Sequence, residues 1–176
     1  MPQTTVSNRQ PQWLGEGQYA TTRARSVDGA VEEAIASGFI AYGRVAVLNP
    51  LTNVVTALSG APAAGSILIV PIMVDRYGMT MTDAFAAVAP DLGYPTGSMV
   101  EYITEGDMVM WSENGGQLNG AVHYRITAGT APNNKVGRVR NAADGVNTAT
   151  ATTIRFAETK AGAGLIAVRI MTSVSL

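Results

Sequence analysis

The side chains best suited to catalysis are few and far apart in this sequence. His123 is the single histidine, and cysteine is absent. A Ser–His–Asp triad would need His123 as its base and a serine held in an oriented turn, but no Gly-x-Ser-x-Gly elbow occurs. His123 lies between Val122 and Tyr124 in an alternating segment, which favours a strand position at the surface or in an interface.

Metal and cofactor sites are equally poorly supported. One histidine without cysteine cannot supply the usual zinc ligands. Asn141, Asp144 and Asn147 offer oxygen ligands for calcium, yet Asp144-Gly145 is better explained as a turn. Residues 15–20 match a dinucleotide fingerprint formally, but a polar, proline-containing segment precedes them where a strand is required. We therefore predict no metal and no cofactor.

Paired carboxylates also give no acid–base site. Glu32 and Glu33 are adjacent, so on a strand they would point to opposite faces. Glu105 and Asp107 flank Gly106 in a predicted turn, where we expect ordinary, solvated acids. The protein is therefore predicted not to be an enzyme.

Arginine is strongly preferred over lysine, with ten Arg and two Lys. Arg138 and Arg140 are two residues apart and so share one face of a strand. The planar guanidinium group pairs geometrically with carboxylates and is enriched at protein interfaces. We predict that Arg138 and Arg140 contact another protein chain, and intramolecular pairing with Asp or Glu stays open as the alternative.

Composition excludes several classes of protein. The chain of 176 residues has a net charge of −1, and 47% of its residues are hydrophobic, which argues against disorder and against nucleic-acid binding. The longest apolar run, residues 67–74, contains Pro71 and falls far short of the roughly 20 residues of a membrane span. The first residues lack the pattern of a secretory signal, so we expect synthesis in the cytoplasm and no membrane association.

Short apolar segments separated by turn residues predict a mainly β protein. We expect a compact antiparallel β-barrel or β-sandwich with an extended N-terminal arm and at most one short helix, over residues 80–88. Asn114-Gly115 predicts a hairpin joining residues 108–111 to 121–126. No internal repeat is visible. The predicted strands cover residues 45–48, 54–56, 66–74, 99–103, 108–111, 121–126, 153–157 and 165–170.

The polar opening, residues 1–25, has few apolar anchors and no helical spacing. We predict an extended arm there, followed by one β-rich domain over residues 26–176. Its anchors are the predicted contact residues Val6, Trp13, Leu14 and Tyr19. The arm could instead lie along its own domain.

Charged residues make up 14% of the chain, against about 25% in typical soluble domains. Edge strands are normally protected by charged side chains, and this chain has few to use. We infer that other protein copies cover much of its surface.

The sequence resembles the structural cement, or head decoration, family of tailed bacteriophages. The similarity runs in order through almost the whole chain, although residues 76–98 look longer than the usual connection of that family. The segments that carry it are Thr4–Asn8, Ile40–Val47, Glu105–Val109, Val122–Gly129, Gly137–Asp144, Ile154–Phe156 and Ala161–Arg169.

This resemblance implies a β-rich protein without catalytic residues, bound to the outer surface of an icosahedral capsid. Its partners would be the major capsid protein, at junctions between subunits, and further copies of itself, with a trimer favoured over a dimer. A tail or fibre component with a glycan-binding role is the structural alternative. A small β-barrel hydrolase that uses His123 is the enzymatic one.

Overall fold

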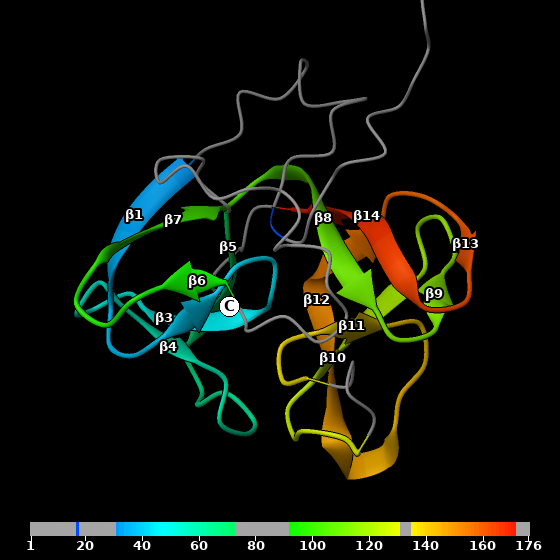
Figure 1. The fold of residues 1–176 in the computed structure, drawn as a ribbon, viewed down its shortest axis with the longest axis horizontal. Coiled ribbons are helices and arrows are strands. Elements are labelled where there is room, and N and C mark those ends of the chain that lie inside the picture. Colours follow the sequence, from blue (N-terminus) through cyan, green and yellow to red (C-terminus); the bar gives the residue numbers. More distant parts are fainter. Residues whose placement is uncertain (1–16, 18–30, 73–91, 131–134, 172–176) are drawn as a thin grey trace, which may run out of the picture.

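The computed structural model describes residues 17, 31–72, 92–130 and 135–171 (Figure 1). Its described residues form fourteen β-strands and one 3-10 turn, η1 (Gly145–Asn147). None of the described residues belongs to a helix that is long and apolar enough to cross a membrane. The prediction of a mainly β fold is therefore confirmed.

The first barrel contains five strands in the closed order β1-β4-β3-β5-β7. β1 pairs with β4 in parallel, and every other neighbouring pair is antiparallel. The predicted turn at Asn49-Pro50 joins β3 to β4, and the Asn49 side chain accepts the N–H of Leu51 at 3.0 Å. A small ladder, β2–β6, lies beside the barrel. The strands are β1 (Val31–Ala36), β2 (Ile40–Ala41), β3 (Ala46–Asn49), β4 (Val54–Ala57), β5 (Ile67–Pro71), β6 (Gly93–Tyr94) and β7 (Met99–Ile103).

The second barrel closes in the order β10-β11-β8-β14-β12. β8 pairs with β11 in parallel, the other pairs are antiparallel, and a small ladder joins β9 to β13. Figure 1 shows the two barrels side by side, the first at the left. The strands are β8 (Gly106–Ser112), β9 (Gly115–Gly116), β10 (Ala121–Arg125), β11 (Val139–Arg140), β12 (Thr148–Phe156), β13 (Lys160–Ala161) and β14 (Gly164–Ile170).

The two barrels have the same topology. Each strand of the first corresponds to the strand seven places later in the second, including the parallel pair and the small ladder. Three backbone hydrogen bonds recur at equivalent residues. They are Ser37 N–H to Val55 O and Glu113 N–H to Val139 O; Gly43 N–H to Pro71 O and Asn119 N–H to Phe156 O; Ile72 N–H to Glu101 O and Ala157 N–H to Ala167 O. The repeat that the sequence does not show is therefore present in the structure.

Left-handed backbone positions also coincide. Gly43 and Asn119 occupy equivalent places with φ of 62° and 61°, and Asn53 and Gly137 do so with φ of 53° and 84°. Glycine and asparagine are the residues that adopt this conformation at least cost. Backbone geometry is thus preserved between the barrels where side chains are not, which explains why the sequence conceals the repeat.

The barrels share hydrophobic contacts. One cluster of buried residues lies within the first barrel, whereas the core of the second also includes Val45, Leu58, Val70, Ile72 and Ile103 from the first. The Val45 N–H donates to the carbonyl of Gly137 at 2.9 Å. A Cβ on Gly137 would lie 2.7 Å from the Val45 oxygen, so this close approach requires glycine.

Several local predictions are corrected. The strand predicted at 99–103 is β7, but the segment predicted at 108–111 extends to Gly106–Ser112. The predicted turn at 104–107 thus shrinks to the short link between the barrels. Asn114-Gly115 does not join β8 to β10 as a hairpin, because β8 pairs with β14 and β11; Gly115 belongs to β9. The predicted helix at 80–88 lies outside the described residues.

Candidate interaction surfaces

His123 has no catalytic surroundings. It lies on β10, and its Nδ1 is 3.0 Å from the hydroxyl of Thr150 on the neighbouring strand β12. No group of three or more potential His, Cys, Asp or Glu metal ligands occurs within the described part of the chain.

The carboxylates considered for acid–base chemistry have structural partners. Glu32 accepts the Tyr102 hydroxyl at 2.7 Å. Asp107 is 5% exposed and binds Arg169 of β14 at 2.8 and 3.1 Å. That hydrogen bond raises the pKa of Arg169 above its usual value. The expectation that Asp107 is a solvated turn residue is therefore wrong, because the turn ends earlier and β8 carries Asp107 into the barrel wall.

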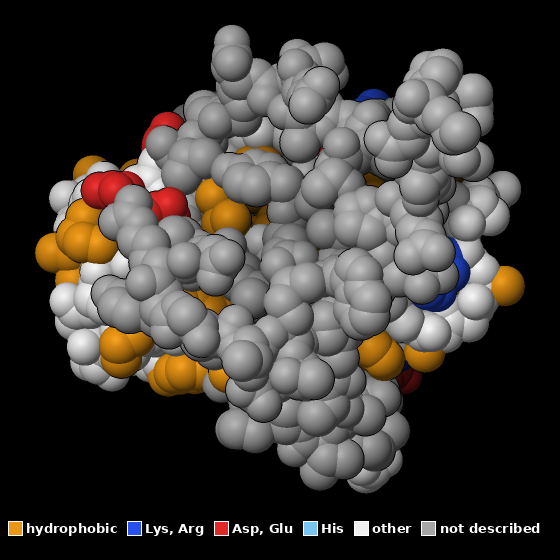
Figure 2. Space-filling view, turned by 45° about the horizontal axis from the view of Figure 1, so that its top comes forward, with side chains coloured by type: hydrophobic (Ala, Val, Ile, Leu, Met, Phe, Trp, Pro, Cys, Tyr) orange, Lys and Arg blue, Asp and Glu red, His pale blue; other side chains and the backbone are white. Residues whose placement is uncertain are grey.

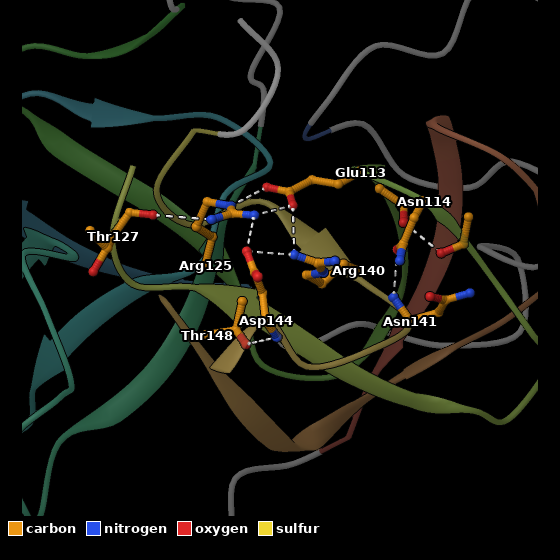
Figure 3. Close-up of polar contacts among 10 residues, drawn as sticks. Glu113, Asn114, Arg125, Thr127, Arg140, Asn141, Asp144 and Thr148 are labelled. Atoms are coloured by element: carbon orange, nitrogen blue, oxygen red, sulfur yellow. Dashed lines mark hydrogen bonds and ion pairs between the residues drawn. The ribbon is translucent and has the colours of Figure 1, made fainter. Parts of the chain in front are cut away.

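A cluster of four charged residues closes one end of the second barrel (Figure 3). The guanidinium group of Arg125 binds both carboxylate oxygens of Glu113 and also Asp144, at 3.0 Å. Arg140 reaches Asp144 at 2.9 Å and Glu113 at 3.5 Å. The hydrogen bond to Glu113 is the main reason that the pKa of Arg125 is raised. Two positive and two negative charges balance, so this rim cluster is a neutral network with a buried centre.

Neutral hydrogen bonds extend the rim cluster. The Asn141 N–H donates to the side chain of Asn114 at 2.9 Å, and the Asp144 N–H donates to the Thr148 hydroxyl at 2.8 Å. The oxygens once considered for calcium thus bind guanidinium groups, because Asp144 faces Arg125 and Arg140.

The predicted contact residues Arg138 and Arg140 both have intramolecular contacts. Arg140 belongs to the rim cluster, and Arg138 lies with its guanidinium carbon 5.1 Å from the ring centroid of Trp111. Such stacking of a cation on indole is favourable, more so where water is excluded. The sequence signal that identified these arginines, their spacing on one strand, does not indicate Glu113 or Trp111 as partners.

The other predicted contact residues, Val6, Trp13, Leu14 and Tyr19, lie outside the described residues. Gly17 is the one residue of the predicted arm that the structure describes. It is buried, and its N–H donates to the carbonyl of Val109 on β8 at 2.8 Å.

The first barrel carries an exposed apolar row that the sequence reasoning missed. Met99, Ile35 and Val54 lie side by side on β7, β1 and β4, and their registers align. Met99 is 51% exposed and Ile35 is 47% exposed. Figure 2 shows hydrophobic side chains with acidic ones close by over the first barrel. The signal was weak because only Glu33 and Ile35 alternate with the buried Ala34 and Ala36 on so short a strand.

Two solved structures are similar to this chain. A chain from the capsid of Myoviridae phage XM1 aligns with a TM-score of 0.60 and 13% identity, covering 93% of this chain and 92% of that one. The head fibre gp8.5 N base of bacteriophage phi29 gives a TM-score of 0.38 at 12% identity, with 80% and 92% covered. No curated protein matches.

The family comparison covers nearly the whole sequence. Residues 2–171 match the family described as structural cement protein (E217 gp24/Pam3 gp6). Both barrels fall within the match, so the family similarity and the observed fold concern the same unit. The chain therefore belongs to the structural cement protein family of phages.

Proposed function

We propose that this protein binds the outer surface of a phage capsid at junctions between major capsid protein subunits and stabilises the shell. The observation that carries the proposal is the family match over residues 2–171. The site geometry agrees with it, because the charged groups examined form structural pairs and the exposed feature of the first barrel is apolar.

The mechanism of stabilisation follows from linkage. A protein that binds the assembled shell and not its dissociated subunits adds its binding free energy to the stability of the shell. A homo-oligomer that engages several subunits gains avidity without any single strong contact. We propose a trimer, which suits threefold and quasi-threefold junctions.

The arm, residues 1–25, is proposed as a second contact element anchored by Val6, Trp13, Leu14 and Tyr19. Extended segments can cover long surfaces and add to exposed sheet edges. Arg138 and Arg140, on the rim of the second barrel, are proposed to face the capsid or a neighbouring copy.

The test uses phage heads assembled without this protein. Purified wild-type protein should bind them at saturable, symmetric positions in electron-microscopy maps and should raise the temperature at which the heads release DNA. Protein lacking residues 1–20 should bind more weakly, and unchanged occupancy would remove the arm from the proposal. Absence of any wild-type binding to such heads would refute the capsid role itself.

A further inference from the structure

The second barrel shows how the exposed row of the first can be covered. The residues equivalent to Met99, Ile35 and Val54 are Leu165, Trp111 and Arg138, because Leu165 is paired with Trp111 as Met99 is with Ile35. In the second barrel the Arg138 guanidinium lies over the indole ring of Trp111. An arginine from the protein's own chain therefore covers the apolar surface at this place.

The first barrel lacks that arginine. Val54 occupies the position equivalent to Arg138 and is too short to cover its neighbours, and Met99 and Ile35 are each about half exposed. A pair of neighbouring half-exposed apolar side chains on a sheet face gains free energy when another molecule covers it.

Charge selects the occupant of this face. Glu33 is exposed next to Ile35 on β1, and it lies directly opposite Glu101 of β7. Neither β1 nor β7 contains Lys or Arg. In the second barrel the equivalent residues, Val109 and Ala167, are uncharged. The face of the first barrel is thus apolar with an acidic border, and it complements a cation.

A second copy of the same face would be a poor occupant. A twofold contact places identical patches against each other, so Glu33 of one copy would approach the carboxylates of the other. Like charges brought together in an interface cost several kcal/mol. The partner must instead bring positive charge.

We propose that the row Met99, Ile35 and Val54 binds a segment of the capsid shell protein that presents an arginine beside an apolar side chain. The arginine would lie over Ile35 as Arg138 lies over Trp111, with its guanidinium group directed to Glu33. This inference rests on the proposed function, since it names the surface through which the capsid is bound.

The first experiment measures binding of variants to heads that lack the protein. Met99→Asp and Glu33→Arg should each weaken binding about tenfold, as expected when a central contact is lost or reversed. Val146→Asp is the matched control for Met99→Asp, because Val146 is 89% exposed on η1 of the second barrel; it should bind like the wild type. Circular dichroism and thermal unfolding establish that each variant is folded.

Ionic strength gives a second measurement on folded protein. Binding of the wild type should weaken with added salt more steeply than binding of Glu33→Gln, because salt screens the charge pair that this variant lacks. Wild-type binding together with unchanged affinity of Met99→Asp and Glu33→Arg would overturn this inference and leave the capsid role intact. Failure of the wild type to bind would refute the capsid role first.

Crosslinking identifies the occupant directly. A photoreactive amino acid at position 99, activated on assembled heads, should join the protein to a peptide of the capsid shell protein that contains arginine. A crosslink to a second copy, or to another segment of the same chain, would overturn the proposal.

Discussion

The two barrels have one topology and opposite solutions at the same end. In the second, Glu113, Arg125, Arg140 and Asp144 form the rim cluster. The first has Ser37, Asn49 and Thr56 at the places of Glu113, Arg125 and Arg140, and all three are exposed. A charged network holds together the loops of one barrel, whereas the other relies on its core and backbone ladder. The pattern of strand pairing therefore does not depend on the rim charges, and these are free to differ.

The largest difference between the barrels should appear when Glu113 is neutralised. Glu113→Gln leaves Arg125, whose side chain is 3% exposed, with only the more exposed Asp144 as an anion. Removing one partner of a buried ion pair costs about 3–5 kcal/mol. We expect a loss of that size in the free energy of unfolding, measured by urea denaturation.

The matched control is Ser37→Ala at the equivalent place in the first barrel. It removes an exposed hydroxyl and should change the free energy of unfolding by less than about 0.5 kcal/mol. Hydrogen exchange read by mass spectrometry should show faster exchange in β10 and β11 for Glu113→Gln. Equal effects of the two substitutions would contradict the contrast between the rims.

Strands with strong local signals were predictable from the sequence, and closure of the barrels was not. β7 was predicted with its exact bounds because apolar residues lie between turn residues. The small ladders consist of two-residue strands, such as Gly115–Gly116, which are too short to show alternation. The parallel pairs β1–β4 and β8–β11 join segments with other strands between them, and no local pattern reports such pairing.

The site was predictable to a smaller extent. The preference for arginine and the spacing of Arg138 and Arg140 indicated residues that make specific contacts. Their partners depend on which strands become neighbours, so Trp111 and Glu113 could not be assigned. The exposed row escaped notice because Ile35 and Met99 come together only through the pairing of β1 with β7.

Equivalent left-handed positions offer a medium-sized test of the repeat. Asn119 is exposed with φ of 61° and corresponds to Gly43. Asn119→Gly should be nearly neutral, whereas Asn119→Ala should cost about 1–2 kcal/mol, because alanine in the left-handed region is strained. Gly43→Asn should likewise be tolerated better than Gly43→Ala. Thermal unfolding measures all four, and a reversed order at either position would break the proposed equivalence.

The smallest effect at neutral pH concerns a buried phenol that only the first barrel has at its site. Tyr102 is 2% exposed and donates to Glu32, whereas the equivalent residue of the second barrel is Val168. Burial, followed by the hydrogen bond and the charge of Glu32, raises the pKa of Tyr102 well above its ordinary value. Tyr102→Phe should cost about 1 kcal/mol at pH 7, because the exposed Glu32 regains water.

The larger consequence appears at alkaline pH. Below pH about 10 the phenol is protonated in both the folded and the unfolded protein, so its contribution to stability is fully present. Above that pH the unfolded chain loses the proton while the native state keeps it, and stability falls as the pH rises. Tyr102→Phe should therefore show a shallower loss of unfolding free energy between pH 9 and 11, and Glu32→Gln an intermediate one, since it retains burial but removes the carboxylate charge. Identical alkaline slopes for Tyr102→Phe and the wild type would show that the phenol ionises as freely in the barrel as in water, and that the first barrel has no titrating group that distinguishes it from the second.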